Sequence, residues 1–111
     1  MSVKERRIEK YETPNGLVPF DEWFEDLDDS IQARIDARLD RIVLGNFGDH
    51  KNVGEGIFEL RFSFGPGYRI YYALDGLEIV LLFAGGDKKT QAKDIKIAQG
   101  YWKAYRIEKE T

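Results

Sequence analysis

The chain of 111 residues contains no cysteine, and this absence excludes disulfide bridges and thiolate metal sites. No segment approaches the roughly 18 consecutive apolar residues that a membrane-spanning helix needs. The N-terminal sequence MSVKERRIEK also lacks the apolar run of a signal peptide. We therefore expect a cytoplasmic protein in a reducing compartment, with no membrane contact.

Histidine is almost absent as well, since His50 is the only one in the chain. A metal site would therefore need carboxylates alone around that imidazole. His50 lies in the glycine-rich stretch NFGDHKNVGEG, which predicts a surface loop. The alternative interpretation of His50 is a catalytic proton donor.

The chain has no large excess of either charge, because its net charge is −3. This value argues against a general polyanion binder, although it leaves room for a local cationic site. Acidic residues concentrate in FDEWFEDLDD, whereas residues 56–111 carry nine basic and seven acidic side chains. The cationic candidates are therefore in the C-terminal half.

The composition, 42% hydrophobic and 14% aromatic, suits one compact core and a single domain over residues 1–111. A first strand is predicted in RRIEKYE, ahead of the turn signal TPNG. Two helices should follow, the first capped by Asp21 and the second ending at Gly45. A third helix, capped by Asp87 or Thr90, closes the chain. The apolar residues at helical spacing in these helices are Phe20, Trp23, Phe24, Leu27, Ile31, Ile35, Leu39, Ile42, Ala92, Ile95, Ala98, Trp102 and Tyr105.

The second helix carries charges of alternating sign, with Arg34, Arg38 and Arg41 set among Asp36 and Asp40. Such alternation is typical of a solvated helix face with internal ion pairs.

Three antiparallel strands are predicted from the period of two in FELRFSFGPGYRIYYALDGLEIVLLFAGG. A three-residue loop at 65–67 would pair Phe64 with Tyr68 and Ser63 with Arg69. A two-residue turn at Asp75 and Gly76 would then put Leu77, Ile79, Leu81 and Phe83 on the same apolar face, and Val80 and Leu82 on the other. The result is an α+β fold of strand, two helices, three antiparallel strands and helix, with the helices packed mainly on the apolar sheet face.

The opposite sheet face carries two arginines, Arg61 and Arg69, which the predicted register makes near neighbours and leaves exposed. Like charges at that distance repel, so a counter-charge is needed. Glu59, Glu78 or an anionic ligand such as a phosphate could supply it, and Arg suits phosphate because its planar fork donates in pairs. Lys88 and Lys89 follow the last strand. Cross-strand ion pairs without any ligand are the alternative interpretation.

The chain resembles the toxins of bacterial toxin–antitoxin modules in the RelE/ParE superfamily, especially the HigB-like "addiction module killer protein" branch. The resemblance rests on ELR in one strand, GPGYRIYY across the next turn and strand, and GGDKKTQ entering the last helix. It covers essentially the whole chain, including the order of its elements.

This resemblance implies an endoribonuclease that cuts translated mRNA at the ribosome and is held inactive by a cognate antitoxin, often a helix-turn-helix protein. Contact with DNA would be only indirect, through that antitoxin. The cleavage would use the 2′-hydroxyl as nucleophile and would need neither metal nor cofactor. The residues that correspond to catalytic or phosphate-binding positions, or lie beside them, are Arg61, Arg69, Lys88, Lys89, Glu59, Tyr71 and Gln91.

Arg61 and Arg69 would hold the phosphate, and Lys88 would be a further clamp or the proton donor. Glu59 is the nearest base on that face, or a residue that positions the arginines. The same superfamily also contains ParE-like toxins that inhibit DNA gyrase by protein–protein contact, which is the alternative function. A toxin fold that has kept antitoxin binding and lost activity is a third possibility.

Overall fold

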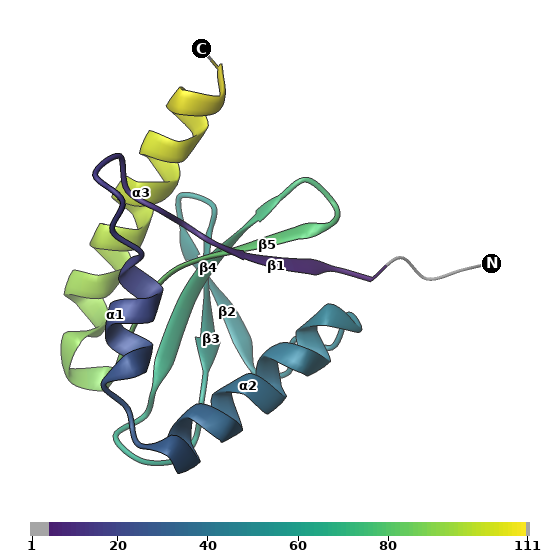
Figure 1. Ribbon diagram of the computed structural model, residues 1–111, viewed down its shortest axis with the longest axis vertical. Coiled ribbons are helices and arrows are strands. Elements are labelled where there is room, and N and C mark those ends of the chain that lie inside the picture. Colours follow the sequence, from purple (N-terminus) through teal and green to yellow (C-terminus); the bar gives the residue numbers. More distant parts are fainter. Residues whose placement is uncertain (1–4, 111) are drawn as a thin grey trace.

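The computed structural model describes residues 5–110, and its elements follow the predicted order with one additional strand (Figure 1). The elements are β1 (Arg7–Lys10), α1 (Pro19–Glu25), α2 (Asp29–Val43), β2 (His50–Gly54), β3 (Ile57–Arg61), β4 (Arg69–Asp75), β5 (Ile79–Gly86), a 3₁₀ turn η1 (Lys88–Thr90) and α3 (Gln91–Glu110). The α+β class and the order of elements are thus confirmed. The ends of the predicted domain, 1–4 and 111, lie outside the described residues. Within 5–110, no helix has the length and apolar character needed to cross a membrane.

The five strands form one mixed sheet in the order β1-β5-β4-β3-β2. β1 runs parallel to β5, and the other neighbours are antiparallel. β2 is the strand that the sequence did not predict. Its residues HKNVG are almost all exposed at the sheet edge, so they show no alternation of apolar and polar side chains.

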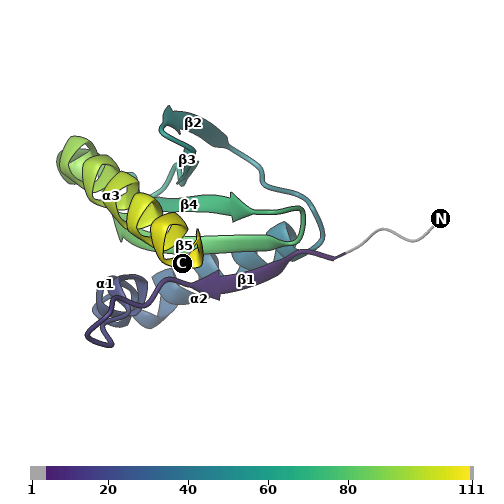
Figure 2. The ribbon, with the colours of Figure 1, turned by 90° about the horizontal axis from the view of Figure 1, so that it is seen from above.

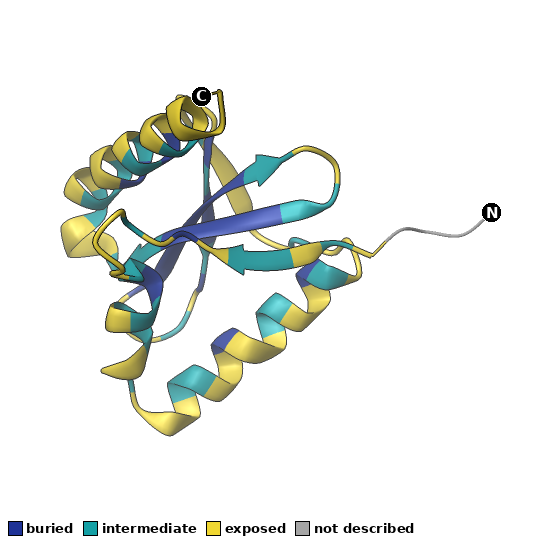
Figure 3. Cartoon of the chain, turned by 45° about the horizontal axis from the view of Figure 1, so that its top comes forward, coloured by how far each residue is buried: buried dark blue, intermediate teal, exposed yellow. Residues whose placement is uncertain are grey.

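Helices cover both faces of the sheet, rather than mainly one as predicted. Figure 2 shows α1 and α2 on one side of the strands and α3 on the other. The core beneath α1 and α2 includes Phe20, Ile35, Ile42, Leu60, Ile70, Tyr72, Val80 and Leu82. The core beneath α3 includes Ile57, Tyr71, Ala73, Leu81, Phe83, Ala98 and Trp102. β4 and β5 are consequently buried through most of their length, while the outer sides of the helices are exposed (Figure 3).

The second core exists because the β4–β5 hairpin has a three-residue loop, residues 76–78, where a two-residue turn was predicted. Asp75 pairs with Ile79. Side chains alternate between faces along a strand, so this register, shifted by three residues, puts the β5 side chains from Ile79 to Phe83 on the face opposite to the predicted one. Val80 and Leu82 therefore face α1 and α2. Leu81 and Phe83 face α3. A bulge at Tyr71 and Tyr72 then returns Ala84, which pairs with Tyr71, to its predicted face.

The β3–β4 hairpin also differs from its predicted register, but by an even number of residues. Arg61 pairs with Arg69, and Leu60 pairs with Ile70. An even shift leaves each side chain on its predicted face. The two arginines therefore do share a face, and they lie directly opposite each other rather than diagonally.

The helix boundaries correct one predicted cap and confirm another. α1 begins at Pro19, with Val18 as its N-cap, so Asp21 lies inside the first turn. Proline is favoured there because its missing N–H group needs no partner at a helix start. Asp87 caps η1 by accepting hydrogen bonds from the backbone N–H groups of Lys89 and Thr90.

Two glycine substitutions test this packing in opposite directions. A Cβ added at Gly85 in β5 would lie 2.1 Å from Cε3 of Trp23, so Gly85→Ala should destabilise the protein by about 2–3 kcal/mol through overpacking.

A Cβ added at Gly100 in α3 would meet open space, so Gly100→Ala should stabilise the protein by about 1 kcal/mol through helix propensity. Urea unfolding of both variants measures the difference. A Gly85→Ala midpoint equal to that of the wild type would contradict the contact with Trp23.

Candidate functional site

Three cationic side chains meet at one pocket, of about 410 Å³, beside the loop that joins β3 to β4. Arg61 ends β3, Arg69 begins β4, and Lys88 begins η1, two residues after the last residue of β5. The other lining residues are Asp49, Phe62, Ser63, Gly65, Pro66 and Gly67. Three of the sequence-predicted site residues are therefore brought together in space.

The strand register fixes the two arginines as neighbours. Arg61 and Arg69 are direct partners across the antiparallel pair, where Cβ atoms lie about 4.5–5.5 Å apart. Two guanidinium groups held that close repel each other unless a negative charge lies between them. The pocket therefore depends on the carboxylate described next.

Glu59 supplies that charge from β3, two residues before Arg61 and on the same face. Its Oε1 lies 3.6 Å from Nε of Arg69 and 3.7 Å from Nε of Arg61. At these distances the groups form ion pairs, but the atoms are too far apart for hydrogen bonds. Within residues 5–110, these three atoms are buried and have no hydrogen-bond partner. The other predicted counter-charge, Glu78, follows the far end of β4, in the 76–78 loop.

The second oxygen of Glu59 is held by two hydrogen bonds. Tyr71 of β4 donates its hydroxyl to Oε2 at 3.1 Å, and Gln91 of α3 donates Nε2 at 2.7 Å. Burial, together with the negative charge of Glu59, raises the pKa of Tyr71 well above its ordinary value, so the hydroxyl keeps its proton and remains a donor. Glu59, Tyr71 and Gln91 therefore lie behind the pocket and support its arginines. Within residues 5–110, none of the three belongs to the pocket lining.

Arg69 is buried, which corrects the expectation of an exposed side chain in mid-strand. Only 3% of the residue is exposed. Its Nη1 donates to the backbone carbonyls of Phe62, Gly67 and Tyr68 at 3.4, 3.1 and 3.1 Å. The guanidinium group therefore holds the 62–68 loop in shape while it forms part of the pocket wall. Arg61 is freer, with 39% of its side chain exposed.

Lys88 reaches the pocket across a glycine. A Cβ added at Gly67 would lie 3.0 Å from Cγ and 3.2 Å from Cδ of Lys88. Gly67 also has φ of +78°, a conformation that other residues rarely adopt. Glycine at this position therefore leaves room for the lysine stem. Lys89 is exposed and lies outside the pocket lining.

Asp49 is a pocket residue that the sequence did not indicate. It lies just before β2, the strand that lacked an alternating pattern, so its position relative to Arg61 was not predictable. Its backbone carbonyl accepts a hydrogen bond from the Arg61 N–H at 2.9 Å, which holds the carboxylate beside the cations. His50 is exposed as predicted. Its Nδ1 lies 2.9 Å from the Gly48 carbonyl, and the ring is outside the lining.

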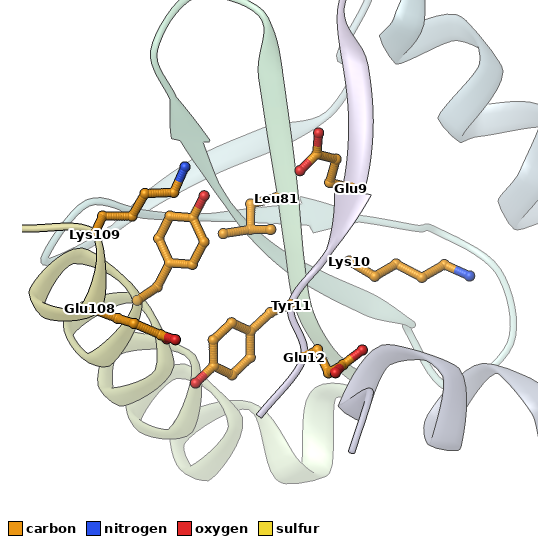
Figure 4. Close-up of a pocket in the computed structure, with 8 residues that line it drawn as sticks. Glu9, Lys10, Tyr11, Glu12, Leu81, Glu108 and Lys109 are labelled. Carbon is orange, nitrogen blue, oxygen red and sulfur yellow. The ribbon is translucent and has the colours of Figure 1, made fainter. Parts of the chain in front are cut away.

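A second hollow of about 340 Å³ lies between the end of β1 and the last turns of α3 (Figure 4). Its two lysines have carboxylate partners: Lys10 lies 2.6 Å from Asp21, and Lys109 lies 3.9 Å from Asp75. The hollow has mixed charge and an apolar wall that includes Leu81. It therefore lacks the uncompensated cations that would attract an anion.

Comparison with known proteins assigns the family. Residues 22–103 match the family described as Phage derived protein Gp49-like (DUF891). The chain belongs to the Gp49-like family. This is a RelE/HigB-like toxin family, so the sequence resemblance is confirmed at that level. A Haemophilus influenzae protein described as an uncharacterized protein is 49% identical over 83 residues, which are 74% of this chain and 84% of that protein. No solved structure matches the chain.

The support behind the pocket of this Gp49-like protein can be tested by removing one charge. Glu59→Gln keeps the shape of the side chain and leaves the buried Arg69 without its counter-charge. Loss of one partner of a buried pair costs about 3–5 kcal/mol, and urea unfolding should show a decrease in stability of that size. Glu25→Gln, at an exposed position of α1, should change stability by less than about 0.5 kcal/mol. Equal midpoints for the two variants would contradict the assigned role of Glu59.

Proposed function

We propose that this Gp49-like protein is the toxin of a toxin–antitoxin module and cuts mRNA while it is translated on the ribosome. The observation that carries the proposal is the convergence of Arg61, Arg69 and Lys88 on one pocket. Arginine pairs are suited to the oxygens of a phosphodiester, since each guanidinium group donates two parallel hydrogen bonds. Membership of a RelE/HigB-like toxin family supports the same conclusion.

The proposed reaction uses the RNA itself as nucleophile. The 2′-hydroxyl oxygen attacks the adjacent phosphorus, and the bond from phosphorus to the 5′-oxygen of the next nucleotide breaks. The 2′-proton passes to a base, and a second proton passes to the leaving 5′-oxygen. The products are a 2′,3′-cyclic phosphate and a 5′-hydroxyl. Negative charge accumulates on the phosphoryl oxygens in the transition state, where fixed cations stabilise it most.

Four residues of the pocket lining, and Glu59 behind it, have roles in this scheme. Arg61 and Arg69 hold the non-bridging phosphate oxygens. Lys88 is the proton donor to the 5′-oxygen, because it is the flexible, exposed cation at the pocket rim. Asp49, the carboxylate in the lining, accepts the 2′-proton. Glu59 is a positioning residue, since both of its oxygens are engaged with the arginines, Tyr71 and Gln91.

A cognate antitoxin is part of the proposal, and we expect a helix-turn-helix protein that supplies the module's only contact with DNA. A surface of opposite charge to the pocket is available for such a partner. The exposed acidic residues in and after α1 are Glu22, Glu25, Asp26, Asp28 and Asp29. A basic segment of the antitoxin would complement them.

Cell-free translation with purified protein tests the nuclease directly, with mRNA ends mapped by primer extension. Wild type should give cuts that appear only during translation. Arg61→Gln and Lys88→Gln should each slow cutting by about 100-fold, as expected for loss of one group that stabilises the transition state. These two side chains are preferable to Arg69, whose burial makes its replacement a risk to folding.

Lys93→Gln is the matched control, since Lys93 is an exposed lysine of α3 outside the pocket. It should cut at the wild-type rate. If wild type leaves mRNA intact during translation, the nuclease proposal is wrong, and inhibition of DNA gyrase becomes the function to assay. If both pocket variants cut at the wild-type rate, the assigned residues are wrong.

A further inference from the structure

A third hollow, which we call the α2 hollow, is rich in arginine and adjoins the cationic pocket. It measures about 290 Å³ and is lined by Arg34, Ala37, Arg38, Arg41, Phe62, Ser63 and Phe64. The three arginines are spaced at i, i+4 and i+7 along α2, which puts them on one face of the helix. Within residues 5–110, no carboxylate lines this hollow.

The ion pairs that the sequence predicted along α2 are not formed. Within the described part of the chain, no ion pair joins Arg34, Arg38 or Arg41 to Asp36 or Asp40. The arginine side chains turn instead toward the end of β3 and the loop that follows it. The prediction of a helix face neutralised by its own carboxylates was therefore wrong, and the arginine face keeps its positive charge.

Arg38 is the structural member of the group. Its Nη1 donates to the Arg61 carbonyl at 2.8 Å, its Nη2 donates to the Asp49 carbonyl at 2.8 Å, and both Nε and Nη2 donate to the Phe47 carbonyl. Its Cζ also lies 4.9 Å from the centre of the Phe62 ring. Arg38 thus ties α2 to the backbone of two residues that line the cationic pocket, and each of its three nitrogens already donates a hydrogen bond.

Arg34 and Arg41 have donors to spare. The Cζ of Arg34 lies 3.6 Å from the centre of the Phe64 ring, so stacking fixes the plane of the guanidinium group while its N–H edge stays available. Arg41 is exposed in the last turn of α2. Among residues 5–110, neither side chain has a carboxylate partner, so both can bind an anion held in the hollow.

The two hollows are neighbours, because Phe62 and Ser63 line both of them. A polyanion seated with one phosphate between Arg61, Arg69 and Lys88 would reach the α2 arginines after it crosses Ser63. A single phosphate would fill the cationic pocket and leave the α2 hollow empty. The arrangement therefore suits a chain of phosphates.

We propose that Arg34 and Arg41 form a second subsite, which binds the phosphate backbone of RNA beside the bond held in the cationic pocket. This inference rests on the proposed function, since it extends the same RNA-binding path. The backbone could belong to the mRNA or to ribosomal RNA, which present the same phosphodiester groups.

The salt dependence of RNA binding measures this subsite without cleavage. The probe is a 2′-O-methyl RNA octanucleotide, which has no free 2′-hydroxyl and cannot be cut. For single strands, the slope of log K against log salt is about −0.7 for each phosphate neutralised. The Arg34→Gln/Arg41→Gln variant should therefore lose about 1.4 from the magnitude of the slope. The affinity of the same variant for a 2′-O-methyl dinucleotide should change less than twofold, because the dinucleotide fills the cationic pocket alone.

The control is Lys103→Gln/Arg106→Gln, which removes the same charge from exposed positions of α3. Arg106 also stacks on an aromatic ring, with Cζ 5.2 Å from the centre of Trp102, so the control matches Arg34 in its local packing. Its slope should equal that of the wild type. Thermal unfolding of both variants checks that loss of stacking has not unfolded the protein.

A second arm measures binding to purified ribosomes. Loss of ribosome binding in the α2 variant with an unchanged octanucleotide slope would assign the phosphates to ribosomal RNA. The inference would be overturned if the α2 variant and the control had equal octanucleotide slopes and equal ribosome binding. Failure of the wild type to bind either probe would also overturn it. A reduced slope in a protein that never cuts mRNA would keep the subsite and reject the nuclease. Normal cutting of mRNA, with both the octanucleotide slope and ribosome binding unchanged in the α2 variant, would reject the subsite and keep the nuclease.

Discussion

The buried carboxylate of Glu59 is the interaction on which the cationic pocket depends. It lies between the Nε atoms of Arg61 and Arg69, and hydrogen bonds from Tyr71 and Gln91 fix its second oxygen. Without that charge, two arginines paired directly across antiparallel strands would repel each other. The same carboxylate joins β3, β4 and the first residue of α3, so one side chain couples the fold to the geometry of the site.

Burial of these charged groups lowers the stability that the sheet could otherwise have. Buried ion pairs lose much of their attraction to desolvation, and apolar replacements are often equally stable. Within the described residues, Oε1 of Glu59 and the two Nε atoms lack hydrogen-bond partners, and such buried polar atoms are uncommon in folded proteins. A sheet shaped for stability alone would gain more from apolar side chains here. Retention of the charges is consistent with a pocket that holds an anion. Glu59 and Arg69 are buried, whereas 39% of the Arg61 side chain is exposed.

The sequence predicted those features that depend on a single element. The period of two in FELRFSF and YRIYYAL was enough to put Arg61 and Arg69 on one face, and the helical spacing of Ile31, Ile35, Leu39 and Ile42 was enough to find α2. What depends on loop length or on distant packing was not predictable. The extra residue in the 76–78 loop puts Leu81 and Phe83 of β5 on the sheet face that α3 covers. The polar edge strand β2, and with it the position of Asp49, has no hydrophobic pattern to indicate it.

We propose that Arg61 and Arg69, held by Glu59, form an anion site for RNA. The most direct test is an NMR titration of ¹⁵N-arginine-labelled protein with a 2′-O-methyl RNA dinucleotide, with the Nε–H signals assigned by single Arg→Lys substitutions. We expect the signals of Arg61 and Arg69 to shift together and to saturate with one binding constant, whereas the signal of Arg106 should not move. Shifts at other arginines while Arg61 and Arg69 stay unchanged would contradict this proposal.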